Sequence, residues 1–223
     1  PPSFIIHMKK KQVSTNNFFV FNEYKAEKLL SNFLPIAKNQ LVKTSKEIKM
    51  KPPFYLKIIS DEALHKTEIK GVRFVNDFSE LEKNFKELLE TAIKRKIKLE
   101  GILVQEKIQG RECIIGIKKD PAFNHVILFG LGGTLTEIFE DISIRKCPIS
   151  LKDAEEMIDE LKSSKLFEEY RGEKVNTSLL QKTLVKISQI PQKYKNIQEL
   201  DINPFIINEK VGKVADARII FSQ

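Results

Sequence analysis

The sequence predicts a mixed α/β protein, of the α+β kind, that is built as two lobes. Up to about residue 98, short apolar runs alternate with helical patterns, as in a small α/β unit. From residue 99, three apolar runs follow one another across glycine turns, and two helical patterns and two further strands come after them. We therefore expect an N-terminal lobe at 14–98 and a C-terminal lobe at 99–223, preceded by an arm at 1–13.

Apolar spacing predicts the elements of the first lobe. Asn22 can cap a helix whose apolar residues recur every three or four positions as far as Phe33. Asp77 to Glu80 has the pattern of a capping box, and helical spacing continues after it. The expected elements are a helix after Asn22, an extended piece at 40–42, a strand at 54–59 and a helix over 78–93 that a basic run at 94–98 closes.

The second lobe is predicted from runs of strand length and from two helical patterns. Ser150 is a suitable cap for the first of these helices, and Pro191 is expected to stop the second. The expected elements are strands at 101–106, 112–117 and 126–129, helices at 151–162 and 177–189, and strands at 200–207 and 214–220.

Composition excludes several classes of protein. The net charge of +8 comes mostly from lysines that are spread through the sequence without an aromatic-basic motif, so we do not expect a nucleic-acid partner. No apolar run approaches the roughly 18 residues that cross a bilayer, so we expect no membrane partner. Cys113 and Cys147 lack the spacing of a zinc site, which favours a reducing, cytoplasmic location. The start PPSFIIHMKKKQV does not read as a signal peptide, and Met8 looks like a natural start.

Three local patterns could carry chemistry, and each also has a plainer reading. Asp201 and Asn203 point to one face of a strand and suit Mg²⁺, although Asn-Pro turns also end ordinary strands. The run Gly130–Gly133 can bring backbone N–H groups close to a phosphate, or can simply be a tight turn. Lys57 lies inside an apolar strand, where it must face solvent, a lobe interface or an anion.

Charged residues beside apolar runs are weaker signals. Gln105 and Glu106 end a strand where a linker between lobes would lie, so they could read an adenine edge and ribose hydroxyls, or merely mark the exit of a strand. Glu112 is uninformative alone. Asp216 and Arg218 share a face and could pair with each other.

The histidine at position 65 lies in a short polar stretch between two apolar runs. No cysteine or carboxylate cluster surrounds it at the spacing of metal ligands, and no nucleophile motif accompanies it. A loop histidine is usually an ordinary polar residue. An exposed imidazole without a fixed base is nevertheless suited to accepting and passing on a phosphoryl group.

The order of these motifs is more specific than any one of them. Along the chain come LKIIS (56–60), ALHKT (63–67), GV (71–72), LVQE (103–106), GRE (110–112), GIKKD (116–120), FGLGG (129–133), ELDINP (199–204) and DAR (216–218). This order closely resembles the β, or ATP-grasp, subunit of ADP-forming acetate–CoA ligase, of the NDP-forming acyl-CoA synthetase family. The resemblance covers about residues 20–221 and is most specific at LHK, FGLGG and ELDINP.

The resemblance implies an ATP-grasp fold that holds ATP or ADP with Mg²⁺ between two lobes. It implies the reaction acyl-CoA + ADP + phosphate ⇌ organic acid + CoA + ATP. It also implies a separate CoA-binding α subunit, in an α₂β₂ heterotetramer, whose phosphorylated histidine carries the phosphoryl group toward the nucleotide.

The resemblance also implies roles for individual residues. His65 would be a second phosphoryl carrier in a histidine loop over 60–71, and Lys66 would neutralise its phosphorylated ring. The other implied roles are nucleotide phosphate contact for Lys57, the adenine–ribose hinge for Gln105 and Glu106, lining of the nucleotide site for Glu112, Mg²⁺ binding for Asp201 and Asn203, and contact with the incoming phosphohistidine or phosphate for Gly130, Gly132 and Gly133.

Two departures and several alternatives remain at this point. Lys70-Gly71 stands where the family usually has Gly-Gly, and the helix expected before Lys57 is shortened to 45–51. The chain could also be a β subunit like that of succinyl-CoA synthetase, a nucleotide-binding regulatory module without turnover, or a basic nucleic-acid binder. The last should bind with steep salt dependence.

Overall fold

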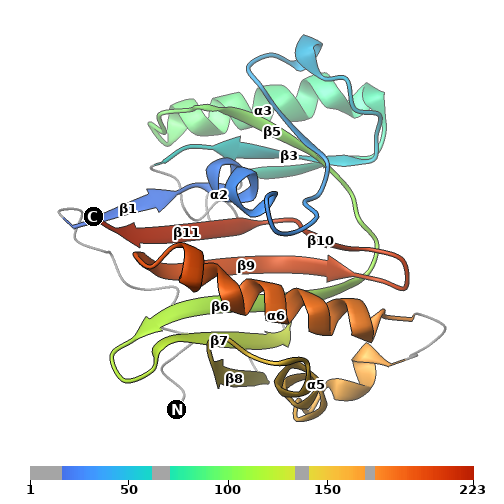
Figure 1. Ribbon diagram of the computed structural model, residues 1–223. Helices are drawn as coiled ribbons and strands as arrows, with labels where there is room; N and C mark the ends of the chain where they lie inside the picture. The colour runs from blue at the N-terminus through green and yellow to red at the C-terminus, as the bar shows by residue number, and fades with distance from the viewer. Residues whose placement is uncertain (1–16, 62–70, 134–140, 169–173) are drawn as a thin grey trace.

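The computed structural model describes residues 17–61, 71–133, 141–168 and 174–223. They form two separate antiparallel sheets with helices packed against them (Figure 1). The larger sheet has the order β1-β11-β9-β6-β7-β8, with β10 paired to β9, and the smaller has the order β2-β5-β3-β4. The strands are β1 (Phe18–Phe21), β2 (Asn39–Val42), β3 (Phe54–Ile59), β4 (Val72–Val75), β5 (Gly101–Glu106), β6 (Arg111–Asp120), β7 (Asn124–Leu131), β8 (Ile142–Lys146), β9 (Ile197–Ile207), β10 (Gly212–Val214) and β11 (Ala217–Ser222).

The helices cover one face of each sheet. Helices α5 (Leu151–Asp159) and α6 (Thr177–Lys193) pack on the larger sheet, and α3 (Leu81–Lys94) packs on the smaller one (Figure 1). Each interface is a separate apolar core: Phe129, Phe167 and Phe205 are fully buried in the larger one, and Leu56 and Leu88 are fully buried in the smaller one. The predicted α/β (α+β) class is therefore confirmed.

Helix α2 (Glu23–Leu30) lies between the two sheets in Figure 1 and begins as predicted at Asn22. The side chain of Asn22 accepts a hydrogen bond from the N–H of Lys25 at 3.1 Å, which satisfies one of the free donors of the first turn. Ala26 and Leu30 are fully buried in the core of the larger sheet. Two carboxylates one turn apart, Glu23 and Glu27, are buried as well, at 2% and 1% exposure.

Strand pairing crosses the lobe boundary that the sequence predicts. Strand β1 pairs with β11, and α2 packs in the same core, so residues before 31 belong to the larger sheet. Strand β5 pairs with both β2 and β3 in the smaller sheet, although it follows residue 98. Local patterns predict that a strand forms, but packing between distant segments decides which sheet it joins.

Several helix bounds also differ from the prediction, among them the end of α5 at Asp159 instead of 162. Helix α6 continues through Pro191 to Lys193 instead of stopping at 189. A proline removes one helical hydrogen bond and crowds the preceding turn, but burial of Ile187 and Ile190 against the larger core holds the last turn. The shortened helix expected at 45–51 is a single 3₁₀ turn, Ser45–Glu47. Further 3₁₀ turns lie at Phe78–Glu80 and Ser164–Phe167, so the helix predicted from residue 78 becomes α-helical only at Leu81.

Within the described part of the chain, none of the helices combines the length and apolar composition that crossing a membrane requires.

Candidate functional site

The two sheets meet where the chain passes between them. A small apolar cluster of Ala37, Ile206 and Ala215, with Ile108 beside it, lies at this junction. Main-chain bonds reinforce it: the N–H of Ala37 donates to the carbonyl of Val214 at 2.8 Å, and Ile36 bridges to Val214. The chain just before β2 and just after β5 therefore lies against β9 and the segment between β10 and β11.

Lys57 is the central polar residue of this junction. It is 8% exposed, and its ammonium donates three hydrogen bonds of 2.8 Å. The acceptors are Glu23 Oε1 on α2, Gln105 Oε1 on the neighbouring strand β5, and the carbonyl oxygen of Ala215 between β10 and β11. Of the readings that the sequence left open, the structure selects the lobe interface, where Lys57 lies buried against a carboxylate.

Gln105 is 1% exposed and bonded at both ends of its amide. Its oxygen accepts from Lys57, and its nitrogen donates to Glu27 Oε1 at 2.9 Å. Asn39 donates to the other oxygen of Glu27 at 2.6 Å. Burial raises the pKa of Glu27 to about 8, and the charge of Lys57 opposes this rise. The described structure therefore gives Gln105 a place in a buried network with α2.

Glu106 ties the linker after β5 to the hairpin of β9 and β10. Its carboxylate accepts from Lys213 Nζ at 2.6 Å and from the N–H of Lys38 at 2.7 Å. Partial burial acts to raise the pKa of Glu106, but the hydrogen bonds from Lys213 and from the N–H of Lys38, together with the charges of both lysines, outweigh it, and the pKa is lowered. Glu106 is therefore held as an anion at the junction.

The other predicted residues lie on the face of the larger sheet that points away from α5 and α6. On β9, buried Ile202 separates half-buried Asp201 from exposed Asn203, so both of the latter face away from the core. On β6, Glu112 is exposed and lies beside Ile206, which belongs to the junction cluster. The carboxylates and the amide predicted to serve the nucleotide thus share one face.

A single short segment joins these two groups of residues. The carbonyl of Ala215 accepts from Lys57, and its N–H donates to the carbonyl of Pro204 at 3.0 Å. The next residue, Asp216, accepts from the N–H of Asn203 through its carbonyl at 3.1 Å. The fold thereby brings the predicted lysine of the smaller sheet and the predicted cation ligands of the larger sheet to the same turn.

The glycine run is placed partly differently from the phosphate loop that the sequence suggested. Gly130 belongs to β7 and lies between Ile114 and Ile142. The N–H of Gly132 donates to the carbonyl of Glu112 at 2.7 Å, and a Cβ there would lie 2.8 Å from the carbonyl carbon of Glu112. Gly133 has a φ of +87°, which favours glycine. Gly132 is therefore required for close packing on β6.

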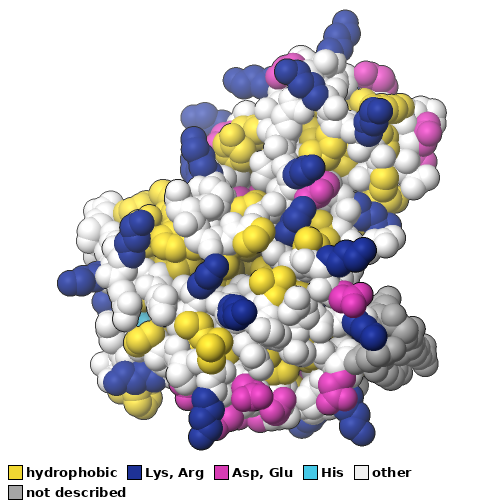
Figure 2. All heavy atoms as spheres, turned by 45° about the vertical axis from the view of Figure 1, so that its right-hand side comes forward, with side chains coloured by type: hydrophobic (Ala, Val, Ile, Leu, Met, Phe, Trp, Pro, Cys, Tyr) yellow, Lys and Arg dark blue, Asp and Glu magenta, His cyan; other side chains and the backbone are white. Residues whose placement is uncertain are grey.

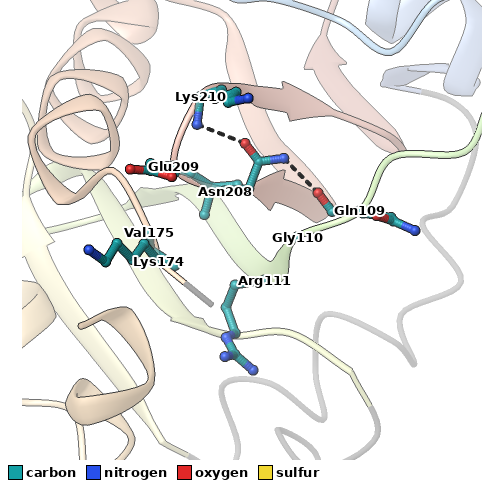
Figure 3. Close-up of a pocket in the computed structure, with 9 residues that line it drawn as sticks. Gln109, Gly110, Arg111, Lys174, Val175, Asn208, Glu209 and Lys210 are labelled. Atoms are coloured by element: carbon teal, nitrogen blue, oxygen red, sulfur yellow. Dashed lines mark hydrogen bonds between the residues drawn. The ribbon is translucent and has the colours of Figure 1, made fainter. Parts of the chain in front are cut away.

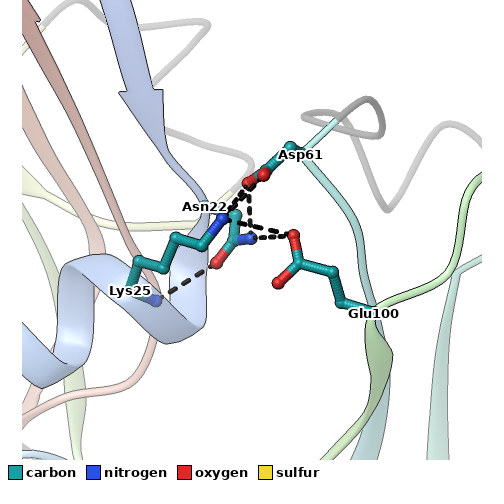
Figure 4. Close-up of polar contacts among 4 residues, drawn as sticks. All are labelled: Asn22, Lys25, Asp61 and Glu100. Atoms are coloured by element: carbon teal, nitrogen blue, oxygen red, sulfur yellow. Dashed lines mark hydrogen bonds and ion pairs between the residues drawn. The ribbon is translucent and has the colours of Figure 1, made fainter.

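His65 and Lys66 lie outside the described residues, but both ends of the segment that holds them are described. Asp61 accepts hydrogen bonds from Lys25 Nζ and from the Asn22 side chain, which also donates to Glu100 at 3.0 Å (Figure 4). At the other end, the carbonyl of Gly71 accepts from the N–H of Ile58 at 2.9 Å. Asp61, before the segment, is therefore bonded to the start of α2, and Gly71, after it, is bonded to β3.

Sequence reasoning missed the carboxylates of α2. Glu23 and Glu27 look like ordinary charged residues of a surface helix, yet both are buried at the junction. Glu23 and Glu27 share one helix face with the apolar residues Ala26 and Leu30, at i, i+3, i+4 and i+7, and this spacing was the available signal that they are buried. Arg218, which was predicted as a possible partner of Asp216, donates to Glu199 at 2.7 Å.

A cavity of about 320 Å³ lies elsewhere, beside the start of β6 and the loop after β9 (Figure 3). It is lined by Arg111, Lys174, Asn208, Lys210 and their neighbours, and by none of the predicted site residues. Arg111 and Glu112 are consecutive on a strand, so the cavity and the predicted nucleotide residues lie on opposite faces of the larger sheet.

The face of the molecule seen in Figure 2 agrees with the expectation that the basic side chains are spread over the molecule. On the face seen in Figure 2, Lys and Arg side chains are scattered over both parts of the molecule, with acidic side chains among them. In the ranges that the structure describes, no group of three or more His, Cys, Asp and Glu is placed to hold a metal ion by itself. A cation site here would therefore need ligands from a bound substrate as well.

Comparison with known proteins identifies the family. The model of a family described as an ATP-grasp domain matches residues 12–221. The chain belongs to the ATP-grasp family. The resemblance and the fold predicted from it are thereby confirmed.

Relatives of this ATP-grasp domain share a common chemistry. It is 36% identical over 212 residues to the β subunit of ADP-forming acetate–CoA ligase II of Pyrococcus furiosus, covering 89% of this chain and 90% of that subunit. It is 41% identical over 216 residues to the ADP-forming acetate–CoA ligase of Methanocaldococcus jannaschii, and covers 89% of this chain but 30% of that protein. The chain thus spans about a third of the longer relatives.

A solved structure has the same fold. The dinucleotide-forming acetyl-coenzyme A synthetase 1 of Ca. Korarchaeum cryptofilum, in complex with coenzyme A, Ca-AMPCP and HgCl⁺, matches with a TM-score of 0.86 and 36% identity over 91% of this chain and 93% of that one. Another structure of that enzyme matches with a TM-score of 0.79 and 35% identity over 91% of this chain and 92% of that one. That structure holds coenzyme A and Mg-AMPPCP, and its phosphohistidine segment points towards the nucleotide-binding site.

Proposed function

We propose that this ATP-grasp domain is the β subunit, or β part, of an ADP-forming acyl-CoA synthetase of the acetate–CoA ligase type. It would transfer a phosphoryl group between a phosphohistidine and ADP in the reaction acyl-CoA + ADP + phosphate ⇌ acid + CoA + ATP. The observation that carries this proposal is the turn at Ala215–Asp216, which contacts Lys57 on one side and the strand of Asn203 on the other. Relatives of the same length and catalytic type support it.

Residues of both sheets would contribute to phosphoryl transfer. Phosphoryl transfer depends mostly on positioning and on charge compensation. Lys57, from the smaller sheet, would compensate phosphate charge, and Glu106 would bind the ribose at the hinge. Glu112 would line the nucleotide site, and the backbone of the run Gly130–Gly133 would meet the incoming phosphohistidine or phosphate. A Cβ on Gly133 would lie 3.8 Å from Glu112 Oε2, so the end of this run is next to Glu112.

Asp201 and Asn203 fit a Mg²⁺ ion that is shared with the nucleotide. Mg²⁺ typically takes one or two protein oxygen ligands and completes its shell with phosphate oxygens and water. An aspartate and an amide on one open face of β9 supply this partial set, in keeping with the lack of a complete cluster among the described residues. When bound, the ion would neutralise negative charge on the β- and γ-phosphates.

His65 completes the proposal as an intermediate carrier, with Lys66 beside it. The described residues on either side of its segment bind to α2 and to β3, the two elements that supply Glu23 and Lys57 to the junction. A CoA-binding α subunit or α part would supply the first phosphohistidine. An α₂β₂ assembly in the cytoplasm is part of the same proposal.

Labelling of the protein with phosphate tests the proposed function. The purified chain is incubated with γ-labelled ATP and Mg²⁺, beside His65→Ala and the matched variant His7→Ala. We expect label that is labile in acid and stable in base on the wild type and on His7→Ala, and none on His65→Ala. Wild-type protein that binds ATP but takes no label, even with an α partner present, would show a nucleotide-binding module without turnover.

A further inference from the structure

The hydrogen bonds of Lys57 leave its ammonium no donor to offer. An ammonium has three N–H donors. All three are used at 2.8 Å, on Glu23, Gln105 and the Ala215 carbonyl, and the side chain is almost fully buried. A phosphate oxygen can be bound by this lysine only if one of the three acceptors is given up.

Glu23 is the acceptor that an incoming phosphate would replace. It is the anion among the three, so a second anion at the same ammonium would be repelled by Glu23 and not by the neutral amide or carbonyl. In addition, Glu27 holds the nitrogen of the Gln105 amide at 2.9 Å, which keeps the amide oxygen turned toward Lys57. Gln105 is therefore fixed in place, whereas the contact with Glu23 is the one that ligand charge opposes.

The contact also joins the two bodies of the fold. Lys57 belongs to the smaller sheet, and Glu23 belongs to a helix that packs in the core of the larger sheet. Breaking the contact between Glu23 and Lys57 removes a charged hydrogen bond between the smaller sheet and α2, at the place where the nucleotide is proposed to enter. The state without ligand is thus stabilised at the cost of ligand binding.

We propose that the ion pair of Glu23 and Lys57 is an autoinhibitory latch, which holds Lys57 away from the nucleotide phosphates until a phosphate takes the place of the Glu23 carboxylate. This inference rests on the proposed function, because it requires Lys57 to contact those phosphates. A latch of this kind raises the dissociation constant of the nucleotide by the factor by which it disfavours the open state. The Glu23→Gln variant keeps the size and a neutral acceptor but removes the charge.

Calorimetric titration with Mg-ADP tests the latch in the full chain. We expect Glu23→Gln to bind Mg-ADP about tenfold more tightly than the wild type, a factor that matches about 1.4 kcal/mol, while its unfolding temperature without ligand falls. If Glu23 had only a structural role, Glu23→Gln would lower both the affinity for Mg-ADP and the unfolding temperature. Glu87→Gln is the matched control, since Glu87 pairs with Arg73 from helix to strand on the α3 face of the smaller sheet.

A double-variant cycle separates the latch from a general effect of charge. In a Lys57→Met background, Glu23→Gln should give no gain in affinity, because the lysine that it releases is absent. A gain that persists there, or a Glu23→Gln variant that binds no more tightly than wild type, overturns the latch. Wild-type protein that does not bind Mg-ADP at all overturns the proposed function and the latch together.

A second variant covers the case in which Glu23→Gln does not fold. Glu23→Asp keeps the charge but withdraws the carboxylate from Lys57 by one methylene. It should bind Mg-ADP more tightly than the wild type, by a smaller factor than Glu23→Gln would. Unchanged or weaker binding by a folded Glu23→Asp variant would also overturn the latch.

Discussion

Removing the charge of Lys57 should destabilise the fold strongly, because its partner would remain buried. In Lys57→Met the side chain is an unbranched chain one heavy atom shorter, and Glu23, whose side chain is 1% exposed, loses the cation that lies 2.8 Å away. Breaking a buried ion pair from one side costs roughly 3–5 kcal/mol. The carbonyl of Ala215 loses a donor at the same time, for about 1 kcal/mol more.

This cost is large compared with the total stability of a domain, which is roughly 5–15 kcal/mol. For a chain of this size, 1 kcal/mol shifts the unfolding midpoint by about 2–4 °C, so a combined loss of about 4–6 kcal/mol predicts a fall of about 8–24 °C. Urea unfolding followed by circular dichroism measures the free energy directly, provided that the slope with urea stays constant. Lys119→Met, at an exposed position of β6, is the control and should change stability by less than about 0.5 kcal/mol.

The double variant Glu23→Gln with Lys57→Met should recover most of the loss, because neither charge is then buried alone. A cost below about 1 kcal/mol for Lys57→Met would refute the reasoning, since the carboxylate of Glu23 would then have to be solvated in the folded protein.

Three further predictions concern neighbouring residues. Burial raises the pKa of Glu27 to about 8, so between about pH 4.5 and pH 8 the folded protein holds a proton that the unfolded chain has released. The free energy of unfolding should therefore fall as pH rises through this range. Urea midpoints measured at each pH should show a smaller fall for Glu27→Gln than for the wild type. Gly132→Ala should lose roughly 1–3 kcal/mol in the same assay, because its Cβ would lie 2.8 Å from the backbone of Glu112, and a neutral result would mean that this contact relaxes freely. Asp201→Asn should raise the Mg²⁺ concentration needed for ADP binding by about tenfold or more, and an unchanged requirement in a magnesium titration would remove Asp201 from the proposed ligands.

The sequence by itself determined most of the elements and the family, although β8 was not among the predicted strands. Caps and apolar periodicity are local, so Asn22 and Ser150 begin helices where they were expected to, and the strand at 54–59 has the predicted bounds. The order of the motifs was enough to predict the ATP-grasp fold that the comparison then confirmed. The roles given to His65 and to the cation ligands remain predictions.

The tertiary structure decided which distant residues meet. No local pattern tells that β1 joins the sheet of β11 or that β5 joins that of β3, because pairing energy comes from partners far along the chain. The same holds for Lys57, whose three acceptors come from three separate segments. Its burial beside Glu23 depends on two bodies packing together, and this is why the latch is visible only in the folded molecule.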